Sequence, residues 1–298
     1  MTQSESRRST RNADKWKPVE GLELAGSLLE RRRFRSKLLA PRREIWTYLP
    51  PGYEESGERR YPVLYLNDGQ NLFDSRIGFG GRSWTVGETI DAMVAMGSIR
   101  PIIVVGIGHA GSHRADEYTP TRDTRHGAGG GAGLYGQLVV NELKPEIDET
   151  FQTDPAREST GIGGSSLGGL VSLYIGAHWP EVFGRVISMS PSIWWDKRHI
   201  LKLIRRLPIN PRPRIWLDSG GREGKGQLPD VRRMRKLLES KGWIEGIDLR
   251  HVEDPVARHE EPAWGKRLPE ALAFLFPPES RPGDIPSPIE QAGSVEVW

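Results

Sequence analysis

The feature that most constrains the fold of this chain is a regular alternation of short apolar segments with longer amphipathic ones. Helices that connect successive strands in this way form right-handed crossovers, which build a mostly parallel sheet with helices on both faces. The first strands follow one another without an intervening helix, so we expect them to form an antiparallel edge. The eight expected strands are residues 22–34, 43–49, 63–67, 102–107, 159–163, 186–190, 215–219 and 247–252, and the expected helices are 86–96, 135–150, 166–178, part of 196–206, 230–241 and 262–276.

The same alternation predicts one α/β domain over residues 21–277, since no linker or internal repeat interrupts it. A chain of 298 residues is long enough to bury a large core in this way. Residues 1–20 are rich in Ser, Arg and Thr and predict a disordered N-terminal tail. Residues 278–298 contain several prolines and predict an extended C-terminal tail.

Charge and cysteine usage exclude several classes of function. The formal net charge is only +3, and no nucleic-acid recognition motif is present, so we expect no nucleic-acid partner. Two basic clusters, residues 31–35 and 232–236, are typical of solvated faces. The absence of cysteine excludes disulfides and thiol catalysis. The first twenty residues lack the apolar core of a secretion signal, and no apolar run could span a bilayer, so we expect a cytoplasmic protein without a membrane partner. The sequence does not indicate an oligomeric state.

A glycine-rich heptapeptide at residues 163–169 contains Gly-x-Ser-x-Gly in one frame, from Gly164 to Gly168, with Ser166 at its centre. The segment before it has the character of a short buried strand. The segment after it carries apolar residues at helical spacing and ends at Trp179-Pro180. A strand, this motif and a helix together are typical of the turn that exposes a nucleophilic serine. We therefore predict Ser166 as a nucleophile; the alternative is a glycine-rich turn with an incidental serine.

A serine nucleophile requires a general base, usually a histidine. Of the histidines that follow Ser166, His259 lies in a loop between the last predicted strand and the final helix, where a base is expected. His251 lies inside the predicted strand and is better explained as a structural residue. His178 ends the helix that Ser166 begins, at the far side of the sheet, and His199 lies early, before the later acids. The sequence thus favours His259.

The third member of such a triad is a carboxylate, for which there are three candidates. Asp218 is the last residue of its predicted strand, and Glu223 lies in the loop just beyond it, which favours Glu223. Asp218 is the rival, unless it caps amides of the turn at Gly220-Gly221. Asp254, close in sequence to His259, is a weaker third.

Two backbone N–H groups are needed to bind the negative oxygen that forms during ester cleavage. We expect one from Leu167, which follows the nucleophile, and one from Gln70, in the loop after residues 63–67. Asp68 is then a buried organiser of that loop rather than a catalytic acid.

The long polar segment from 109 to 136 is a candidate lid over the site. Its Arg114 is a possible substrate-pocket residue, although a solvated arginine is an alternative. The pair Trp194-Trp195 is a second pocket candidate, with packing against a neighbouring helix as the alternative.

No cofactor or metal is predicted. Residues 106–111 read Gly-x-Gly-x-x-Gly after a strand, but the polar residues that follow run into Pro120, so we expect no helix there and no dinucleotide site. His109 and His113 have helical spacing, but no carboxylate pattern completes a metal site.

These residues resemble the putative-esterase family of α/β-hydrolases, which includes siderophore esterases, feruloyl esterases, S-formylglutathione hydrolases and antigen-85-type acyltransferases. The resemblance covers about residues 30–276 and is carried by the segments 49–53, 61–73, 117–120, 163–169 and 259–264. It implies an α/β-hydrolase fold, with Ser166 as nucleophile, His259 as base, Glu223 as acid and Gln70 as the second oxyanion amide. The chain departs from the family at Ala257-Arg258, where a glycine pair often precedes the histidine.

The expected activity is therefore hydrolysis of a small carboxylic ester through an acyl-enzyme, with a siderophore-type ester as one candidate substrate. Two alternatives stay open: acyl transfer by the same triad, and a non-catalytic binding protein of the same fold.

Overall fold

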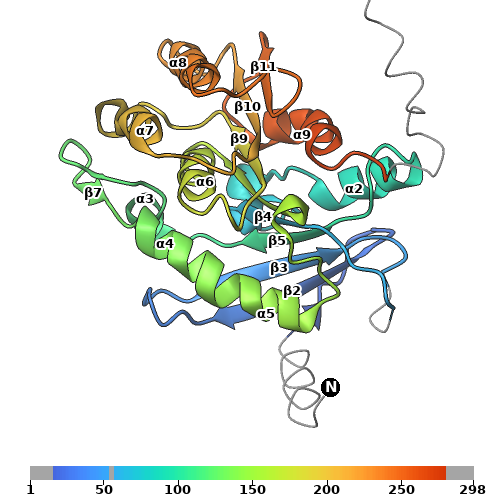
Figure 1. The fold of residues 1–298 in the computed structure, drawn as a ribbon. Coiled ribbons are helices and arrows are strands. Elements are labelled where there is room, and N and C mark those ends of the chain that lie inside the picture. Colours follow the sequence, from blue (N-terminus) through green and yellow to red (C-terminus); the bar gives the residue numbers. More distant parts are fainter. Residues whose placement is uncertain (1–15, 54–56, 280–298) are drawn as a thin grey trace, which may run out of the picture.

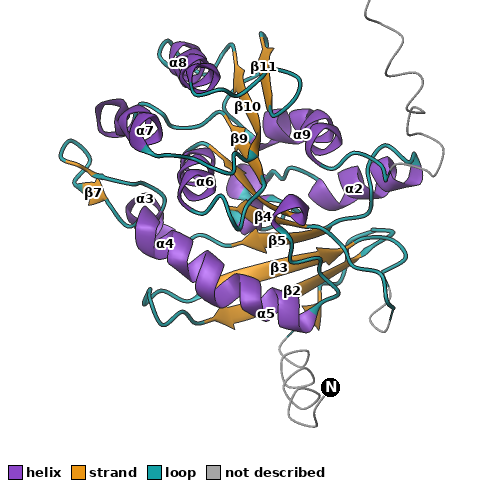
Figure 2. Ribbon diagram, in the orientation of Figure 1, coloured by secondary structure: helices purple, strands orange, loops and turns teal. Residues whose placement is uncertain are grey.

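The computed structural model describes residues 16–53 and 57–279, which form a central sheet with helices on both of its faces (Figures 1 and 2). The sheet has nine strands in the order β1-β2-β3-β5-β4-β8-β9-β10-β11. The pairs from β1 to β5 are antiparallel, and all pairs from β5 through β4 to β11 are parallel. This confirms the mostly parallel sheet and its antiparallel edge. The strands are β1 (Lys17–Pro18), β2 (Ser27–Phe34), β3 (Arg43–Leu49), β4 (Val63–Asn67), β5 (Ile103–Ile107), β8 (Thr160–Ser165), β9 (Arg185–Met189), β10 (Arg214–Gly220) and β11 (Leu249–Asp254).

The count of eight strands predicted from the sequence is wrong by one, because β1 adds a ninth at the edge. Lys17 pairs with Glu30 of β2, and both residues of β1 are exposed. Such a short, exposed strand carries no apolar alternation that a sequence pattern could show. It also lies within residues 1–20, which were expected to be a tail. Residues 1–15 and 280–298 of the two predicted tails lie outside the described residues.

The helices cover the two faces unequally. α2 (Val86–Ala95) and α9 (Glu261–Leu275) pack on one face. The other face carries α4 (Ala132–Leu138), the π-helical turn η4 (Val139–Leu143), α5 (Lys144–Thr150), α6 (Leu167–His178), α7 (Trp195–Arg206) and α8 (Gln227–Ser240).

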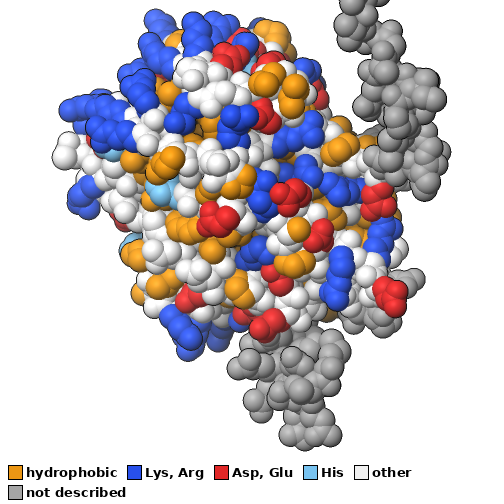
Figure 3. Space-filling model, viewed as in Figure 1, with side chains coloured by type: hydrophobic (Ala, Val, Ile, Leu, Met, Phe, Trp, Pro, Cys, Tyr) orange, Lys and Arg blue, Asp and Glu red, His pale blue; other side chains and the backbone are white. Residues whose placement is uncertain are grey.

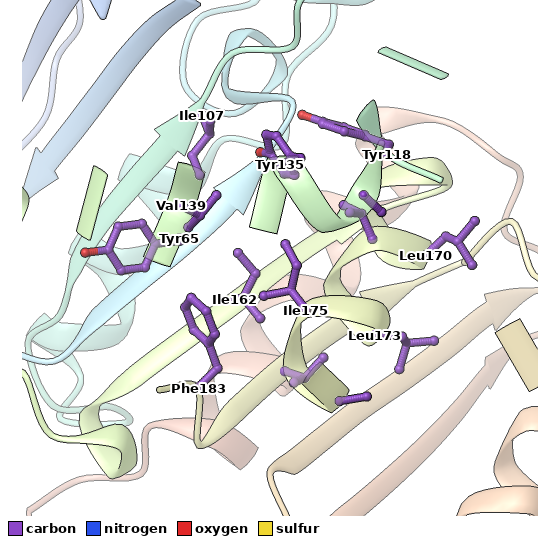
Figure 4. Packing of buried hydrophobic residues seen from close by; sticks show 14 of the residues in the cluster. Tyr65, Ile107, Tyr118, Tyr135, Val139, Ile162, Leu170, Leu173, Ile175 and Phe183 are labelled. Atoms are coloured by element: carbon purple, nitrogen blue, oxygen red, sulfur yellow. The ribbon is translucent and has the colours of Figure 1, made fainter. Parts of the chain in front are cut away.

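Side chains of the central strands alternate between the two apolar cores that these helices close. In β4, Val63 and Tyr65 face one core, and Leu64 and Leu66 face the other. Figure 4 shows the first of these cores, where Tyr65 packs close to other labelled side chains of the cluster. This burial on both faces explains why the strands are continuous apolar runs.

Glycines let β8 lie at the centre of the sheet despite their weak strand propensity. A Cβ atom on Gly163 would lie 2.8 Å from both Ile187 Cβ and Leu66 Cδ2. The neighbouring strands therefore fill the space that a side chain would need, and β8 is positioned to present Ser165 and Ser166 at its carboxyl end.

The segment 109–136 contains more structure than expected. It forms a 3₁₀ turn η3 (Gly111–His113), the four-residue helix α3 (Arg114–Glu117) and a small hairpin of β6 (Arg122–Asp123) and β7 (Ala128–Gly129). The prediction that no helix follows residues 106–111 is wrong. The single turn of α3 is held by tertiary contacts, since Glu117 forms a buried ion pair with Arg43.

Lys and Arg side chains gather over α7 and α8, at the upper left of Figure 3. On α8, Arg232 pairs with Glu253, Arg233 with Asp230 and Arg235 with Glu239, and all three arginines are partly exposed. No helix in residues 16–53 and 57–279 is long and apolar enough to cross a membrane.

Candidate active site

Ser166 lies on the turn between β8 and α6, as its motif predicts. Its backbone has φ 57° and ψ −122°, a conformation that non-glycine residues rarely adopt. The turn is held by the Ser166 N–H, which donates to Met189 O at 3.0 Å. The turn needs glycine at Gly164, where an added Cβ would lie 2.9 Å from the backbone carbon of Gly168.

The Ser166 hydroxyl opens into a cavity of about 350 Å³ that His259 also lines. Within the described residues, Ser166 Oγ has one hydrogen-bond partner, Ser192 Oγ at 3.3 Å. The other residues that line the cavity are Asp68, Gln70, Asn71, Phe79, His109, Gly111, Arg114, Ser165, Glu261 and Trp264.

His259 and Glu223 lie together. His259 Nδ1 is 3.0 Å from Glu223 Oε2, and the Glu223 side chain is fully buried. An ionised carboxylate can only accept, so the proton of His259 lies on Nδ1 and Nε2 is left as an acceptor. The imidazole also packs edge-on against Trp264, with ring centroids 4.9 Å apart. Ala257 and Arg258 adopt no positive φ, so this loop does not need the glycine pair that often precedes the histidine.

Asp218 is turned away from the histidine. Its carboxylate accepts from Trp216 Nε1 at 2.8 Å and from Arg267 Nη2 at 3.0 Å. The amide that it binds is Ser190 N–H, at 3.2 Å, so the prediction that it caps the turn at Gly220-Gly221 is wrong. Complete burial raises the pKa of Asp218, although Arg267 beside it acts in the opposite direction.

Asp254 and His251 also have structural surroundings. Asp254 Oδ1 accepts from the Val256 and Ala257 amides, and so shapes the turn before His259. His251 is almost buried in β11, with Nε2 2.9 Å from Glu253 Oε1.

Sequence reasoning missed the polar group behind Glu223, which centres on Ser190. Ser190 Oγ donates to Glu223 Oε1 at 2.6 Å and accepts from Trp264 Nε1 and Arg267 Nη2. Gly220 N–H donates to the same Glu223 oxygen at 2.7 Å. These contacts fix the Glu223 carboxylate. Because they join β9, β10 and α9, no local motif marks them.

Leu167 and Gln70 are located where they could offer free amides. Leu167 is the first residue of α6, and Gln70 lies in the single 3₁₀ turn η1 (Gly69–Asn71), so neither N–H has a partner inside its own helix. The start of α6 and the residue before η1 lie close together, since an added Cβ on Gly168 would lie 3.0 Å from Asp68 Oδ2. The Gln70 side chain is held by the His109 N–H at 3.4 Å.

Of the three predicted pocket residues, only Arg114 reaches the cavity. It is not a solvated side chain, because Nε and Nη2 donate to the Asp68 carboxylate at 2.7 and 2.8 Å. Asp68 is buried, as expected of an organiser of its loop. Trp194 and Trp195 are not among the residues that line the cavity: Trp195 Nε1 donates to Thr121 O at 2.8 Å, and its ring stacks on His126. The tryptophan pair therefore packs against the segment 109–136 instead of the site.

Among the described residues, no group of three or more His, Asp or Glu side chains could hold a metal ion.

Comparison with known proteins gives both relatives and structural neighbours. Over 251 residues the chain is 27% identical to the uncharacterized protein YbbA of Bacillus subtilis, covering 80% of this chain and 94% of YbbA. Over 255 residues it is 28% identical to the iron(III) enterobactin esterase of Escherichia coli K12, covering 82% of this chain and 56% of that esterase. The chain thus spans a little more than half the length of the enterobactin esterase.

The structure is similar to that of the BES protein from Bacillus cereus, with a TM-score of 0.69 and 22% identity over 87% of this chain and 99% of that one. It is also similar to the enterobactin esterase FES from Shigella flexneri, with a TM-score of 0.67 and 22% identity over 87% of this chain and 58% of that one. At this level of identity the likeness shows a shared fold.

The sequence pattern of the family described as "Putative esterase" matches residues 36–275, which is most of the chain. Relatives that bear the name esterase agree with it. The chain therefore belongs to this esterase family, and it is a carboxylic-ester hydrolase with an α/β-hydrolase-like fold.

Proposed function

We propose that this protein hydrolyses a small carboxylic ester with Ser166 as nucleophile, His259 as general base and Glu223 as the carboxylate that orients His259. The observation that carries the proposal is the convergence of two unusual features on one cavity. Ser166 lies on a strained turn that exposes its hydroxyl, and His259 is held by a buried carboxylate through Nδ1. Strain and buried charge both cost stability, and they are commonly found together where they serve catalysis.

In the proposed first step, His259 Nε2 takes the proton of Ser166 as Oγ attacks the carbonyl carbon of the ester. The Leu167 and Gln70 amides donate to the oxygen that becomes negative. His259 then gives the proton to the departing alcohol, and an acyl-Ser166 is left. His259 then takes a proton from a water molecule that attacks the acyl carbon. The bond to Ser166 Oγ breaks, the carboxylic acid leaves, and His259 returns the proton to the serine.

Before attack, the Ser166 hydroxyl must turn from Ser192 toward His259. Its contact with Ser192 Oγ is 3.3 Å long, so little energy holds it there. Catalytic hydrogen bonds are often loose without substrate and tighten in the complex.

Relatives that match part of this chain support a proposal for the substrate class. They include a ferri-bacillibactin esterase of Bacillus subtilis, 31% identical over 166 residues, and a xylanase/feruloyl esterase of Xylanibacter ruminicola, 33% identical over 146 residues. We propose a siderophore-type lactone or another small ester for this chain. A cavity of about 350 Å³ is of the size that small ligands occupy.

Pre-steady-state hydrolysis of p-nitrophenyl acetate tests the mechanism. An acyl-enzyme predicts a burst of nitrophenol close to one equivalent per chain, absent in Ser166→Ala and present in the neighbouring control Ser165→Ala. A burst that survives in Ser166→Ala would overturn the assignment. A panel of lactone, feruloyl, acetyl and thioester substrates then ranks the substrate classes, and added acceptor alcohols measure any acyl transfer.

A further inference from the structure

Glu261 is a buried carboxylate in the active-site cavity that the proposed mechanism does not use. It is the first residue of α9, two positions after His259, and only 7% of its surface is exposed. It lines the same cavity as Ser166 and His259. Its carboxylate is therefore positioned to meet a substrate rather than bulk water.

Glu261 also differs from the other carboxylates that are equally buried in the described part of the chain. Each of the others has a basic side chain within 4 Å, whereas Glu261 has none. Those pairs are Asp68–Arg114, Asp74–Arg76, Glu117–Arg43, Asp123–His126, Asp218–Arg267 and Asp230–Arg198.

The contacts that Glu261 does make compensate its charge only in part: its own backbone N–H, Arg82 and His259 favour the charged form, but no basic side chain forms an ion pair with it. One side chain donates to it, Asn71 Nδ2 at 3.2 Å from Oε1. The nearby Arg82 pairs with Glu260 instead. The start of α9 supplies a partial positive charge, worth about half an elementary charge. Burial accordingly raises the pKa of Glu261, and the charge of Asp68 adds to this effect. A bound cation would remove the cost of burying this charge.

The cavity offers an aromatic surface as well. Phe79 lines it and is 77% exposed, although a large apolar ring is usually covered. Its N–H donates to Asn71 Oδ1 at 3.0 Å, so Asn71 joins the Phe79 loop to Glu261. The face of an aromatic ring attracts cations.

The positive charge already present in the cavity reaches Glu261 only at a distance. Arg114 gives two hydrogen bonds to Asp68, so it acts on Glu261 without forming an ion pair with it. The remaining basic side chains of the lining are His109 and His259, and a general base must be neutral to act.

We propose that Glu261 is a substrate-binding residue that selects esters carrying an ammonium group, held between its carboxylate and the Phe79 ring. The inference rests on the proposed function and narrows it. Among small esters, cationic ones bind best. Of the two classes proposed above, the inference favours another small ester over a siderophore-type lactone, because a carboxylate or catecholate at this position is disfavoured by charge repulsion.

The test compares acetylcholine with 3,3-dimethylbutyl acetate, which has the same shape without the charge. Acid release gives kcat/KM for both esters, and the ratio of the two values is independent of the amount of active enzyme. We expect a ratio of about ten or more for the wild type, because a desolvated cation that meets a carboxylate and a ring gains about 1.4 kcal/mol or more, which is tenfold. Glu261→Gln should lower the ratio severalfold, to the preference that the Phe79 ring alone supplies. The control Glu270→Gln makes the same change at an exposed position of α9, outside the cavity lining, and should keep the wild-type ratio.

A wild-type ratio near one, or a ratio that Glu261→Gln leaves unchanged, would overturn the inference. Hydrolysis of p-nitrophenyl acetate separates this failure from failure of the proposed function. Wild-type protein that hydrolyses this ester without preferring acetylcholine refutes only the role of Glu261, whereas protein that hydrolyses none of the three esters refutes the proposed function as well.

Discussion

Replacing Glu223 with glutamine should lower kcat for p-nitrophenyl acetate by about four orders of magnitude, or about 5.5 kcal/mol, with little change in KM. The two residues have nearly the same shape, so the loss would come from the position of one proton. In the wild type, Glu223 Oε2 accepts from His259 Nδ1, which keeps Nε2 free to receive the Ser166 proton.

The structure fixes the orientation that the new amide would adopt. Glu223 Oε1 accepts from Gly220 N–H and from Ser190 Oγ, and the Ser190 hydroxyl already accepts from two other donors. The glutamine oxygen must therefore take this position, which turns the NH₂ group toward His259. An NH₂ group can only donate, so His259 would carry its proton on Nε2, where it cannot act as a base. In the reversed orientation the NH₂ group would face Gly220 N–H and the Ser190 hydroxyl, and these donors would lose their acceptor, at a cost of about 1–3 kcal/mol for each one.

Burst amplitude with p-nitrophenyl acetate gives the concentration of active sites, so kcat can be compared per folded enzyme. Asp218→Asn is the matched control. Asp218 is a buried carboxylate at the end of the same strand, and it does not contact His259. The Asp218→Asn protein should therefore be less stable but keep kcat within about tenfold of the wild type. A Glu223→Gln enzyme within tenfold of the wild type would refute the reasoning. So would Asp218→Asn if its kcat fell as far as that of Glu223→Gln.

Three further outcomes follow from other contacts. Gly164→Ala should lower the free energy of unfolding in urea by about 1–3 kcal/mol, because its Cβ would lie 2.9 Å from a backbone carbon. Gly226→Ala, with open space around it, should change this free energy by no more than about 0.5 kcal/mol. Equal losses in the two variants would refute the packing argument. Ser190→Ala should lower kcat about tenfold at constant KM, since Glu223 loses a donor; an unchanged kcat would contradict this role. The ratio of kcat/KM for acetylcholine to kcat/KM for 3,3-dimethylbutyl acetate should fall as acid protonates Glu261. Because burial raises the pKa of Glu261, this fall should occur at a higher pH than the pKa of about 4.3 that is typical of an exposed glutamate. The charged groups that face Glu261 are Asp68, Arg82, Arg114 and His259. Protonation of His259 slows the hydrolysis of both esters, so its effect on catalysis drops out of the ratio. A ratio independent of pH would contradict the assignment.

Features that depend on local sequence could be predicted well. The alternation of strands and helices indicates the parallel sheet, and the glycine motif indicates the turn at Ser166, because both leave a pattern within a few residues. The loop positions of His259 and Glu223 also favoured their meeting, which the structure shows. Their catalytic roles stay predictions.

Features that depend on contacts between distant segments could not be predicted. Ser190 joins Glu223, Trp264 and Arg267 only because β9, β10 and α9 meet behind the loop. Trp195 was a pocket candidate by its position, but the fold of residues 109–136 gives its indole a hydrogen-bond partner elsewhere, the Thr121 carbonyl oxygen. Glu261 becomes distinctive only when the partners of every other buried carboxylate are known. The two-residue strand β1 is set by its partner β2 rather than by its own sequence.

The central claim is that Ser166 is the nucleophile, and labelling with a fluorophosphonate probe tests it most directly. Intact mass should show one probe per chain, and peptide mapping should place it on Ser166. Ser166→Ala should carry no label, and an excess of an ester that the enzyme hydrolyses should prevent labelling of the wild type. Protein that stays unlabelled while it hydrolyses esters, or a label that maps to Ser165 or Ser192, would contradict the account.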